Sequence, residues 1–108
     1  MDHIHIEEPS EFARYREQLS QRQVTTIAMD FEGEFNLHQY GEKLCLIQVF
    51  DGEQFAAIDP FGLSAAALKD FLESRHILKI MYDSMSDQAL VAKQYDAEVA
   101  SILDLRPA

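Results

Sequence analysis

Apolar residues recur at helical spacing near the start of the chain. Phe12, Tyr15 and Leu19 lie three or four positions apart within residues 9–23, which places them on one face of a helix. Ser10, close to the start of this segment, is a residue type that caps helices. The pattern predicts an amphipathic helix over residues 9–23, with its apolar stripe packed against a core.

Three short runs of apolar and β-branched residues follow, each of a length typical of strands. They cover residues 24–32, 43–51 and 54–60. Asp51 and Gly52 stand between the second and third runs, and Asp-Gly is a strong signal for a tight hairpin. We expect three strands that follow one another in an antiparallel meander.

The second half of the chain alternates between helical and strand-like segments. Good helix formers fill residues 64–74 and 85–97, and apolar runs typical of strands fill residues 76–84 and 98–106. Strands that alternate with helices favour parallel pairing. The whole order predicts an α/β fold, in which an antiparallel three-strand meander is followed by parallel strands with helical crossovers.

The composition limits both the size of the protein and its partners. The chain has 108 residues, of which 47% are hydrophobic and 26% charged, so we expect one domain with a single modest core. Its formal net charge is −10. Proteins that bind nucleic acid through its phosphates usually present clustered Lys and Arg. A polyanionic partner would therefore need positive charge from another source.

Two features favour a cytoplasmic location without membrane contact. Cys45 is the single cysteine, so no intramolecular disulfide indicates an oxidising compartment. The first residues are acidic where a signal peptide is basic, and no apolar run reaches the length of a membrane span. His3 and His5 could coordinate a metal on a strand, but a frayed terminus with solvated histidines is the favoured interpretation.

Two carboxylates follow directly after the apolar part of the first expected strand. Asp30 and Glu32 lie two positions apart, so their side chains share one face of the strand and Phe31 points to the other. The lead-in at residues 26–29 predicts burial on both faces, with the acids at the carboxyl end, where ligands bind in open α/β sheets. On spacing alone, a solvated strand end remains the alternative.

A second acidic point lies in the later half of the chain. Asp83 ends an apolar run, and Asp87 falls in the first turn of the helix expected over residues 85–97. Asp87 by itself is also typical of a residue that stabilises a helix amino terminus. Together with Asp30 and Glu32 it gives three oxygen ligands without His or Cys, the preference of Mg²⁺ or Mn²⁺. The acids therefore predict a site for a hard divalent cation, which would supply positive charge for holding phosphate.

Four stretches in a fixed order resemble a known family. They are IAMDFEGEF, KLCLIQVFDG, FAAIDP and the helix start SDQAL. In this order they are similar to the 3′-5′ exonuclease domain of the ribonuclease D type, in the DEDD group, close to the Egalitarian-like subgroup. The resemblance runs from about Val24 to the end of the chain, and it implies a ribonuclease H-like mixed sheet.

By this resemblance Asp30, Glu32 and Asp87 are the catalytic residues and the metal ligands of a two-metal site for Mg²⁺ or Mn²⁺. Asp30 would bridge the two metals, Glu32 would hold the metal that activates water, and Asp87 would serve the metal on the leaving-group side. The implied reaction hydrolyses phosphodiesters at the 3′ end of single-stranded RNA or DNA and releases nucleoside 5′-monophosphates.

The chain departs from the family's pattern at two points. Tyr82 stands where many relatives have His, and the basic residue of the second motif is replaced. The third motif, a Tyr or His followed four residues later by the last catalytic Asp, is not supplied by SILDLRPA, where Asp104 matches a different strand-end Asp. We expect residues 1–108 to be the N-terminal part of a single exonuclease domain, incomplete and inactive in isolation. Self-association through an uncovered sheet is a further expectation.

Two functions stay open. The three matched acids favour a metal-dependent exonuclease domain. The missing third motif favours a non-catalytic nucleic-acid-binding or protein-interaction module that retains the fold, as in some Egalitarian-like relatives.

Overall fold

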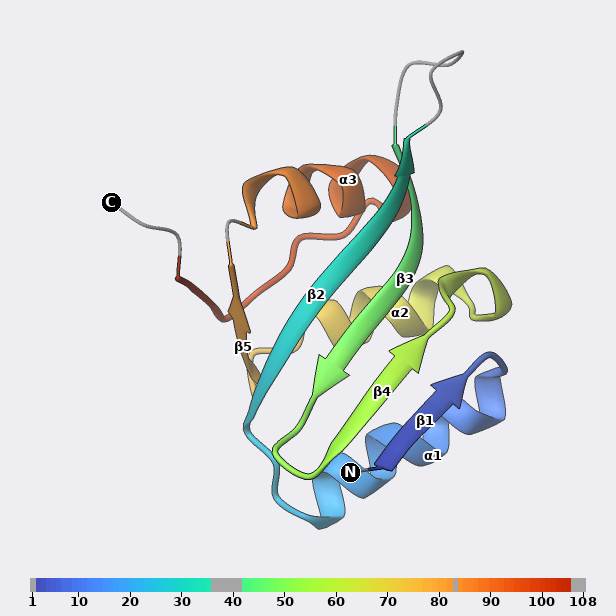
Figure 1. The fold of residues 1–108 in the computed structure, drawn as a ribbon, viewed down its shortest axis with the longest axis vertical. Coiled ribbons are helices and arrows are strands. Elements are labelled where there is room, and N and C mark those ends of the chain that lie inside the picture. Colours follow the sequence, from blue (N-terminus) through green and yellow to red (C-terminus); the bar gives the residue numbers. More distant parts are fainter. Residues whose placement is uncertain (1, 36–41, 83, 106–108) are drawn as a thin grey trace.

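The computed structural model describes residues 2–35, 42–82 and 84–105, which form one sheet and a layer of helices (Figure 1). Its strands are β1 (Asp2–Ile6), β2 (Thr26–Phe35), β3 (Glu42–Phe50), β4 (Gln54–Ile58), β5 (Leu78–Met81) and β6 (Ile102–Asp104). The helices are α1 (Pro9–Gln21), α2 (Ala65–Leu72) and α3 (Met85–Tyr95), and a short 3-10 turn covers Pro60–Gly62. No helix in these ranges is long and apolar enough to cross a membrane.

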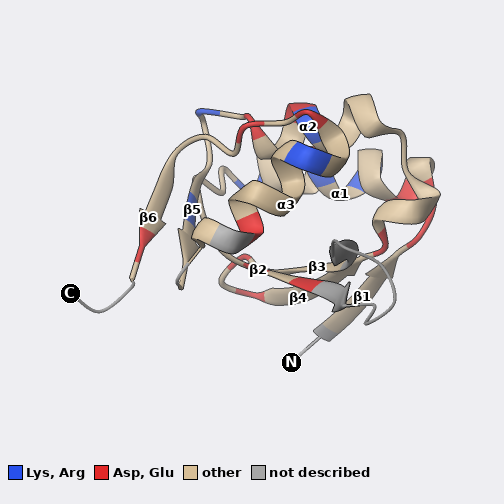
Figure 2. Ribbon diagram, turned by 90° about the horizontal axis from the view of Figure 1, so that it is seen from above, with Lys and Arg blue, Asp and Glu red and all other residues tan. Residues whose placement is uncertain are grey.

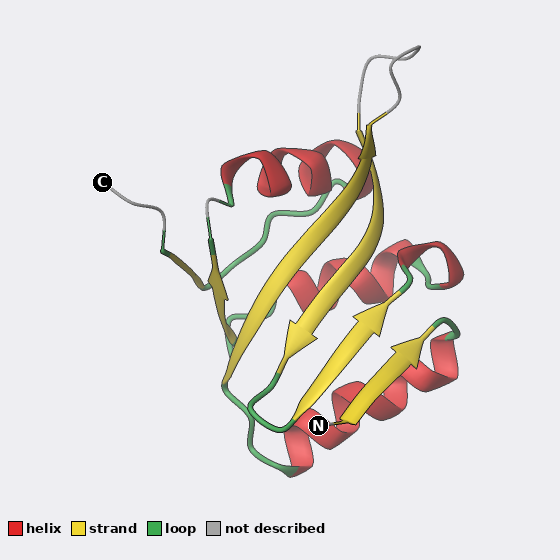
Figure 3. Cartoon of the chain, viewed as in Figure 1, coloured by secondary structure: helices red, strands yellow, loops and turns green. Residues whose placement is uncertain are grey.

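The strands lie in the order β1-β4-β3-β2-β5-β6. β2 and β4 both pair antiparallel with β3, whereas β1 pairs parallel with β4, and β5 pairs parallel with both β2 and β6. The predicted meander followed by parallel strands is therefore confirmed. Figure 3, and the view from above in Figure 2, show α1, α2 and α3 on the same side of the sheet.

The amino-terminal stretch is an edge strand, so the prediction of a frayed terminus is wrong. β1 pairs with β4 along its whole length, and the backbone N–H of Asp59 donates to the carbonyl of Ile6 at 2.8 Å. Ile6 is buried in the core, and the His3 ring stacks on Phe55 with the ring centroids 5.3 Å apart. The alternation of His and Ile is itself a strand pattern, and the otherwise free edge of β4 gives it a partner.

One face of β2 is packed and the other is open. Ile27 and Met29 are buried beneath the helices, whereas Ala28 and Asp30 are exposed on the opposite face. The prediction that residues 26–29 are buried on both faces is wrong, because the described helices all lie on one side. A half-buried strand can carry charged side chains on its open face without any desolvation of the charge.

The first helix begins at Pro9, where the predicted segment begins, and ends at Gln21. Its cap is Glu8 instead of Ser10. The Glu11 carboxylate reaches back and accepts the backbone N–H groups of Glu7 and Glu8, each at 3.0 Å. These two bonds satisfy donors that a helix start otherwise leaves without a partner.

The last strand covers Ile102–Asp104 instead of the predicted 98–106. Asp96 and Ser101 have φ angles of 51° and 58°, in the left-handed region, so the chain turns at both positions before it pairs with β5. Ala97 and Val99 are nevertheless buried. Their alternation with polar neighbours is the pattern that suggested a longer strand.

A lysine of β5 lies in the core with no exposed surface. Lys79 Nζ donates to the carbonyls of Ser74, Ile77 and Ala100 at 2.6, 3.0 and 2.9 Å. These carbonyls belong to the turn before β5 and to the segment before β6, so the ammonium group connects these two segments of the chain. Burial, assisted by the charge of Arg16, lowers the pKa of Lys79 from 10.5 to about 8.

The hairpin turn between β3 and β4 is tied to α1 by a buried carboxylate. The Asp51 side chain, which has no exposed surface, accepts from the Tyr15 hydroxyl at 3.1 Å and from Arg22 Nη2 at 2.9 Å. It also accepts the backbone N–H groups of Glu53 and Gln54, each at 3.0 Å. Burial alone raises the pKa of Asp51, but these hydrogen bonds, led by that from Arg22, outweigh burial and hold the pKa below its usual value.

Lys79 predicts a pH dependence of stability. Between pH 8 and 10.5 the unfolded chain should bind more protons than the folded protein, so the free energy of unfolding should rise with pH. Lys79→Met should remove this rise and, because it leaves three carbonyls without their donor, lower stability near neutral pH by about 1–3 kcal/mol. Urea unfolding across this range measures both effects, with Lys93→Met on α3 as the control. A rise that persists in Lys79→Met would contradict this assignment.

Asp51 predicts an acid limb of stability. Its contribution should be complete above the ordinary pKa of 3.8 and be lost as the pH falls through the lower pKa of the folded protein. Asp51→Ala should remove this limb and cost about 3 kcal/mol at neutral pH, because Tyr15 and Arg22 lose a buried partner. The control is Asp70→Ala, which breaks an exposed pair with Arg16 and should cost less than about 1 kcal/mol. Equal losses in the two variants, measured by thermal unfolding, would refute the prediction.

Candidate active site

β2 presents two of the predicted site residues together. Asp30 and Glu32 are both exposed on the open face of the sheet, and Phe31 between them is buried on the other face. The pairing with β3 is irregular here, because Glu32 lies opposite Leu46 whereas Gly33 lies opposite Leu44. β3 therefore carries one extra residue beside the acids, and such bulges redirect side chains next to functional sites.

A hollow of about 510 Å³ opens on the same face. Asp30 lines it together with Gln48, Phe50, Tyr82 and Leu105. Gln48 lies directly opposite Asp30 in the antiparallel pair. Its side-chain Nε2 donates to Glu32 Oε1 at 3.5 Å. Asp30 therefore stands in a hollow whose wall holds an amide, three aromatic rings and several apolar side chains.

The third predicted residue, Asp87, lies on the neighbouring element. β2 and β5 run parallel with Ala28 beside Ile80, so β5 ends at Met81 beside the middle of β2, close to the acids. β2 itself continues to Phe35, so the prediction that Asp30 and Glu32 lie at its carboxyl end is wrong. Tyr82 follows the end of β5 and is 66% exposed. α3 begins directly afterwards, with Asp87 half-buried in its first turn, as predicted.

A carboxylate of β6 anchors the start of α3. Asp104 Oδ2 accepts the backbone N–H of Ser84 at 3.0 Å and the Ser84 hydroxyl at 2.8 Å. Ser84 has no exposed surface, and its Oγ also accepts from Gln88 Nε2 at 2.8 Å. Asp104 therefore fixes the turn that carries Asp87.

The donor chemistry of the acids fits a hard divalent cation. Asp30 and Glu32 offer exposed carboxylate oxygens from one strand, and Asp87 offers another from the helix that follows β5. Among the described residues, no group of three or more His, Cys, Asp and Glu side chains is close enough to hold a metal. The structure thus brings two of the predicted ligands together on one face and places the third on the next element. Asp83 lies outside the described residues.

Gln48 and Ser84 were not among the predicted site residues, and no contact was predicted for Asp104. A signal existed for Gln48, because it is a polar residue within the apolar run CLIQVF. The contact between Ser84 and Asp104 joins residues twenty positions apart and depends on the pairing of β5 with β6. No local pattern indicates it.

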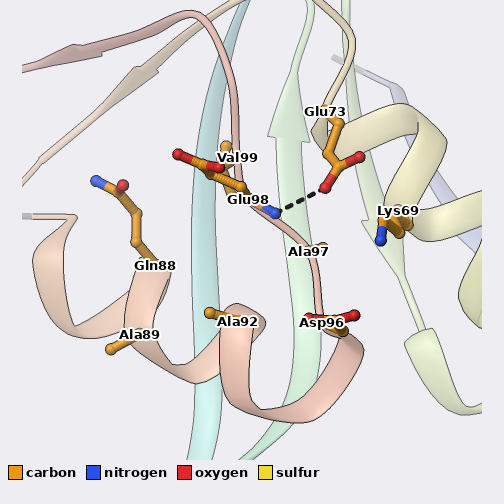
Figure 4. A pocket seen from close by; sticks show the side chains of 9 residues that line it. All are labelled: Lys69, Glu73, Gln88, Ala89, Ala92, Asp96, Ala97, Glu98 and Val99. Carbon is orange, nitrogen blue, oxygen red and sulfur yellow. Dashed lines mark hydrogen bonds between the residues drawn. The ribbon is translucent and has the colours of Figure 1, made fainter.

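A second hollow, of about 590 Å³, lies between α2, α3 and the segment after α3 (Figure 4). It is lined by Lys69, Glu73 and Glu98 among others, and the backbone N–H of Glu98 donates to Glu73 Oε2 at 2.8 Å. This hollow is larger than the one beside Asp30. It contains neither Asp30 nor Glu32, so it has no part in the predicted chemistry.

Residues 4–108 match the profile of a family described as 3′-5′ exonuclease. The chain belongs to this 3′-5′ exonuclease family. The matched range includes the acids of β2 and the helix start at Asp87. A search of curated proteins finds no match for the chain.

Solved structures share the fold of this exonuclease domain. Escherichia coli RNase D, an exoribonuclease involved in structured RNA processing, is similar with a TM-score of 0.82 and 28% identity, over 96% of this chain and 27% of that chain. For the EXD2 exonuclease domain soaked in Mg and GMP the values are 0.80 and 18%, over 97% and 57%. For Trypanosoma brucei RNase D in complex with RNA U12 they are 0.78 and 17%, over 96% and 38%. The fold is therefore the ribonuclease H-like exonuclease fold, and the chain spans 27–57% of the length of these proteins.

The anchor of α3 generates a prediction. Asp104→Ala should leave the buried Ser84 hydroxyl without this acceptor, cost about 1–3 kcal/mol, and speed amide hydrogen exchange in the first turn of α3. Leu103→Ala is the control, because this neighbour on β6 is 47% exposed. Hydrogen exchange followed by mass spectrometry compares the two variants. Unchanged exchange at residues 84–88 in Asp104→Ala would show that β6 does not hold the helix start.

Proposed function

We propose that this chain belongs to a metal-dependent 3′-5′ exonuclease domain of the ribonuclease D type, which hydrolyses phosphodiesters at the 3′ end of single-stranded RNA or DNA and releases nucleoside 5′-monophosphates, and that residues 1–108 by themselves are inactive. The observation that carries the proposal is the pair of exposed carboxylates, Asp30 and Glu32, on the open face of β2 in an exonuclease fold. Water solvates both carboxylates on this open face, and a bound cation would reduce the repulsion between them.

Asp30, Glu32 and Asp87 would hold Mg²⁺ or Mn²⁺. A divalent ion, when bound in such a site, lowers the pKa of a coordinated water and stabilises the charge on the attacking and leaving oxygens. Two-metal binding by these three acids follows the family's pattern. The metal would also offset the net charge of −10, which otherwise opposes the approach of a polyanion.

The hollow beside Asp30 fits the end of a single strand. Tyr82 and Phe50 line it, and aromatic rings stack on bases without regard to sequence. Gln48 supplies a neutral amide in the same wall. A single-stranded 3′ end could lie across this hollow with its terminal phosphodiester near Asp30.

Two relatives support the ligands that we propose. The EXD2 exonuclease domain was soaked in Mg and GMP, and Trypanosoma brucei RNase D was solved in complex with RNA U12. A divalent metal and an RNA strand are therefore the first ligands to test on this chain. A cytoplasmic location is proposed from the sequence alone.

A non-catalytic module that retains the fold is the second candidate. It is favoured by the lack of a three-ligand metal group among the described residues, and by Tyr82 in place of the family's His. Exposed apolar side chains near the edge at β5 and β6 include Tyr82, Leu103 and Leu105, at 66%, 47% and 55% exposure. Such a surface suits a protein contact or self-association.

Metal binding tests the proposal first. Saturating Mn²⁺ should raise the free energy of unfolding by about 1–3 kcal/mol through mass action, and Asp30→Ala and Asp87→Ala should lose this response. Glu17→Ala on α1 removes an exposed carboxylate outside the site and should keep it. An unchanged response in Asp30→Ala, measured by thermal unfolding, would remove the proposed metal site.

Product analysis separates the two candidates. Labelled single-stranded RNA and DNA are incubated with Mn²⁺ and the chain, and 5′-monophosphates are measured. Because the third motif was not found in the sequence, we expect release close to background from these 108 residues. Release that depends on Asp30 would establish the enzyme and refute that expectation. A version extended by the downstream segment decides between the candidates. Release that is lost in its Asp30→Ala variant would support the exonuclease, and RNA binding without release would favour the non-catalytic module.

A further inference from the structure

We propose that Gln48 is a positioning residue, whose side-chain amide holds the Glu32 carboxylate beside Asp30. The inference rests on the proposed function in one respect, that the two acids form the metal site. The contact between Gln48 and Glu32 is an observation about the fold and does not depend on that function.

The register of the sheet gives Gln48 access to both acids. It lies directly opposite Asp30, where side chains in an antiparallel pair have Cβ atoms about 4.5–5.5 Å apart. Glu32 is its diagonal neighbour, at about 7–8 Å, which only a long side chain can span. Gln48 spans it, since Nε2 lies 3.5 Å from Glu32 Oε1. One amide therefore adjoins Asp30 by register and reaches Glu32 by hydrogen bonding.

The backbone on which Gln48 stands is firmly held. Its neighbours Ile47 and Val49 are 0% and 1% exposed, packed on the opposite face of β3. Strand β3 also pairs on both sides, with β2 and with β4. A side chain on a packed central strand has a fixed backbone position. A positioning residue requires this.

Glu32 needs such support more than Asp30 does. The ladder between β2 and β3 shifts register between Glu32 and Gly33, and pairing resumes with Gly33 opposite Leu44. The extra residue is on β3, and such a bulge disrupts the ladder locally, beside the acid. The amide of Gln48 supplies a contact at the position where the register shifts.

The amide also suits the chemistry of a metal site. Asp30 and Glu32 repel each other on one face of a strand, and an N–H donor reduces this cost without adding charge. A lysine at this position would pair with the carboxylates and compete with a cation for them. A carboxylate that accepts a hydrogen bond at one oxygen can coordinate a metal through the other. Loss of such outer partners typically weakens metal binding about 10–100-fold.

The experiment uses a matched pair of variants. Gln48→Met keeps the length of the side chain and removes the amide. Gln21→Met is the control, because Gln21 Nε2 donates to Glu17 Oε1 at 3.3 Å on α1, the same kind of bond outside the site. Mn²⁺ alone is the probe, titrated calorimetrically. We expect Gln48→Met to bind Mn²⁺ at least about tenfold more weakly with an unchanged melting temperature, and Gln21→Met to bind as the parent does.

A metal-free measurement keeps this test separate from the proposed function. In a ¹H–¹⁵N spectrum, Glu32→Gln should move the side-chain amide signals of Gln48, whereas Glu17→Gln should move those of Gln21. The proposal would be overturned if Glu32→Gln left the Gln48 amide signals in place, or if Gln48→Met left the affinity for Mn²⁺ unchanged. If the parent chain binds no Mn²⁺, the proposed function fails, and the amide signals alone decide whether Gln48 positions Glu32.

Discussion

The packing of α1, α2 and α3 on one face of the sheet determines where the side chains of residues 27–32 of β2 point. A strand alternates its side chains, so burial of Ile27, Met29 and Phe31 leaves Asp30 and Glu32 on the open face. A shift by one residue would drive both carboxylates into the core, at a desolvation cost that no described partner there offsets. Burial of the apolar side chains of β2 therefore fixes its acidic side chains on the open face.

The parallel arrangement of β2, β5 and β6 also determines where Asp87, the second acidic point, lies relative to β2. β5 and β6 end side by side at Met81 and Asp104, next to the middle of β2, and α3 begins there. Open α/β sheets bind ligands outside the carboxyl ends of their strands. Asp104 at the end of β6 holds Ser84 at the start of α3, so the strand that is last in sequence sets the helix that carries Asp87. The hollow beside Asp30 has Tyr82 and Leu105, which follow β5 and β6, in its wall together with Gln48 and Phe50 of β3.

Two buried charges connect the elements that frame this hollow. At the hairpin turn, Asp51 accepts hydrogen bonds from Tyr15, Arg22 and two backbone N–H groups. Lys79 donates to three carbonyls in the segments that precede β5 and β6. Neither takes part in the proposed chemistry. Each is fully hydrogen-bonded, which is the condition under which a folded protein tolerates a charge in its core. They join α1 to the meander and β5 to β6 at the opposite ends of the strands from Asp30.

The sequence by itself determined the α/β class, the meander, the hairpin at Asp51 and the pairing of Asp30 with Glu32 on one face. These features follow from local periodicity and turn chemistry, which act within a few residues. It did not predict β1, the burial of Lys79 beside a 37% exposed Leu78, or the contacts of Gln48 and Asp104. Only the tertiary structure decided these, because each depends on which distant strand lies alongside and on which face of the sheet the helices pack. Lys79 is tolerated in the core because three carbonyls from two separate segments meet there, and Gln48 reaches Glu32 because the register of β2 and β3 places the carboxylate within its length.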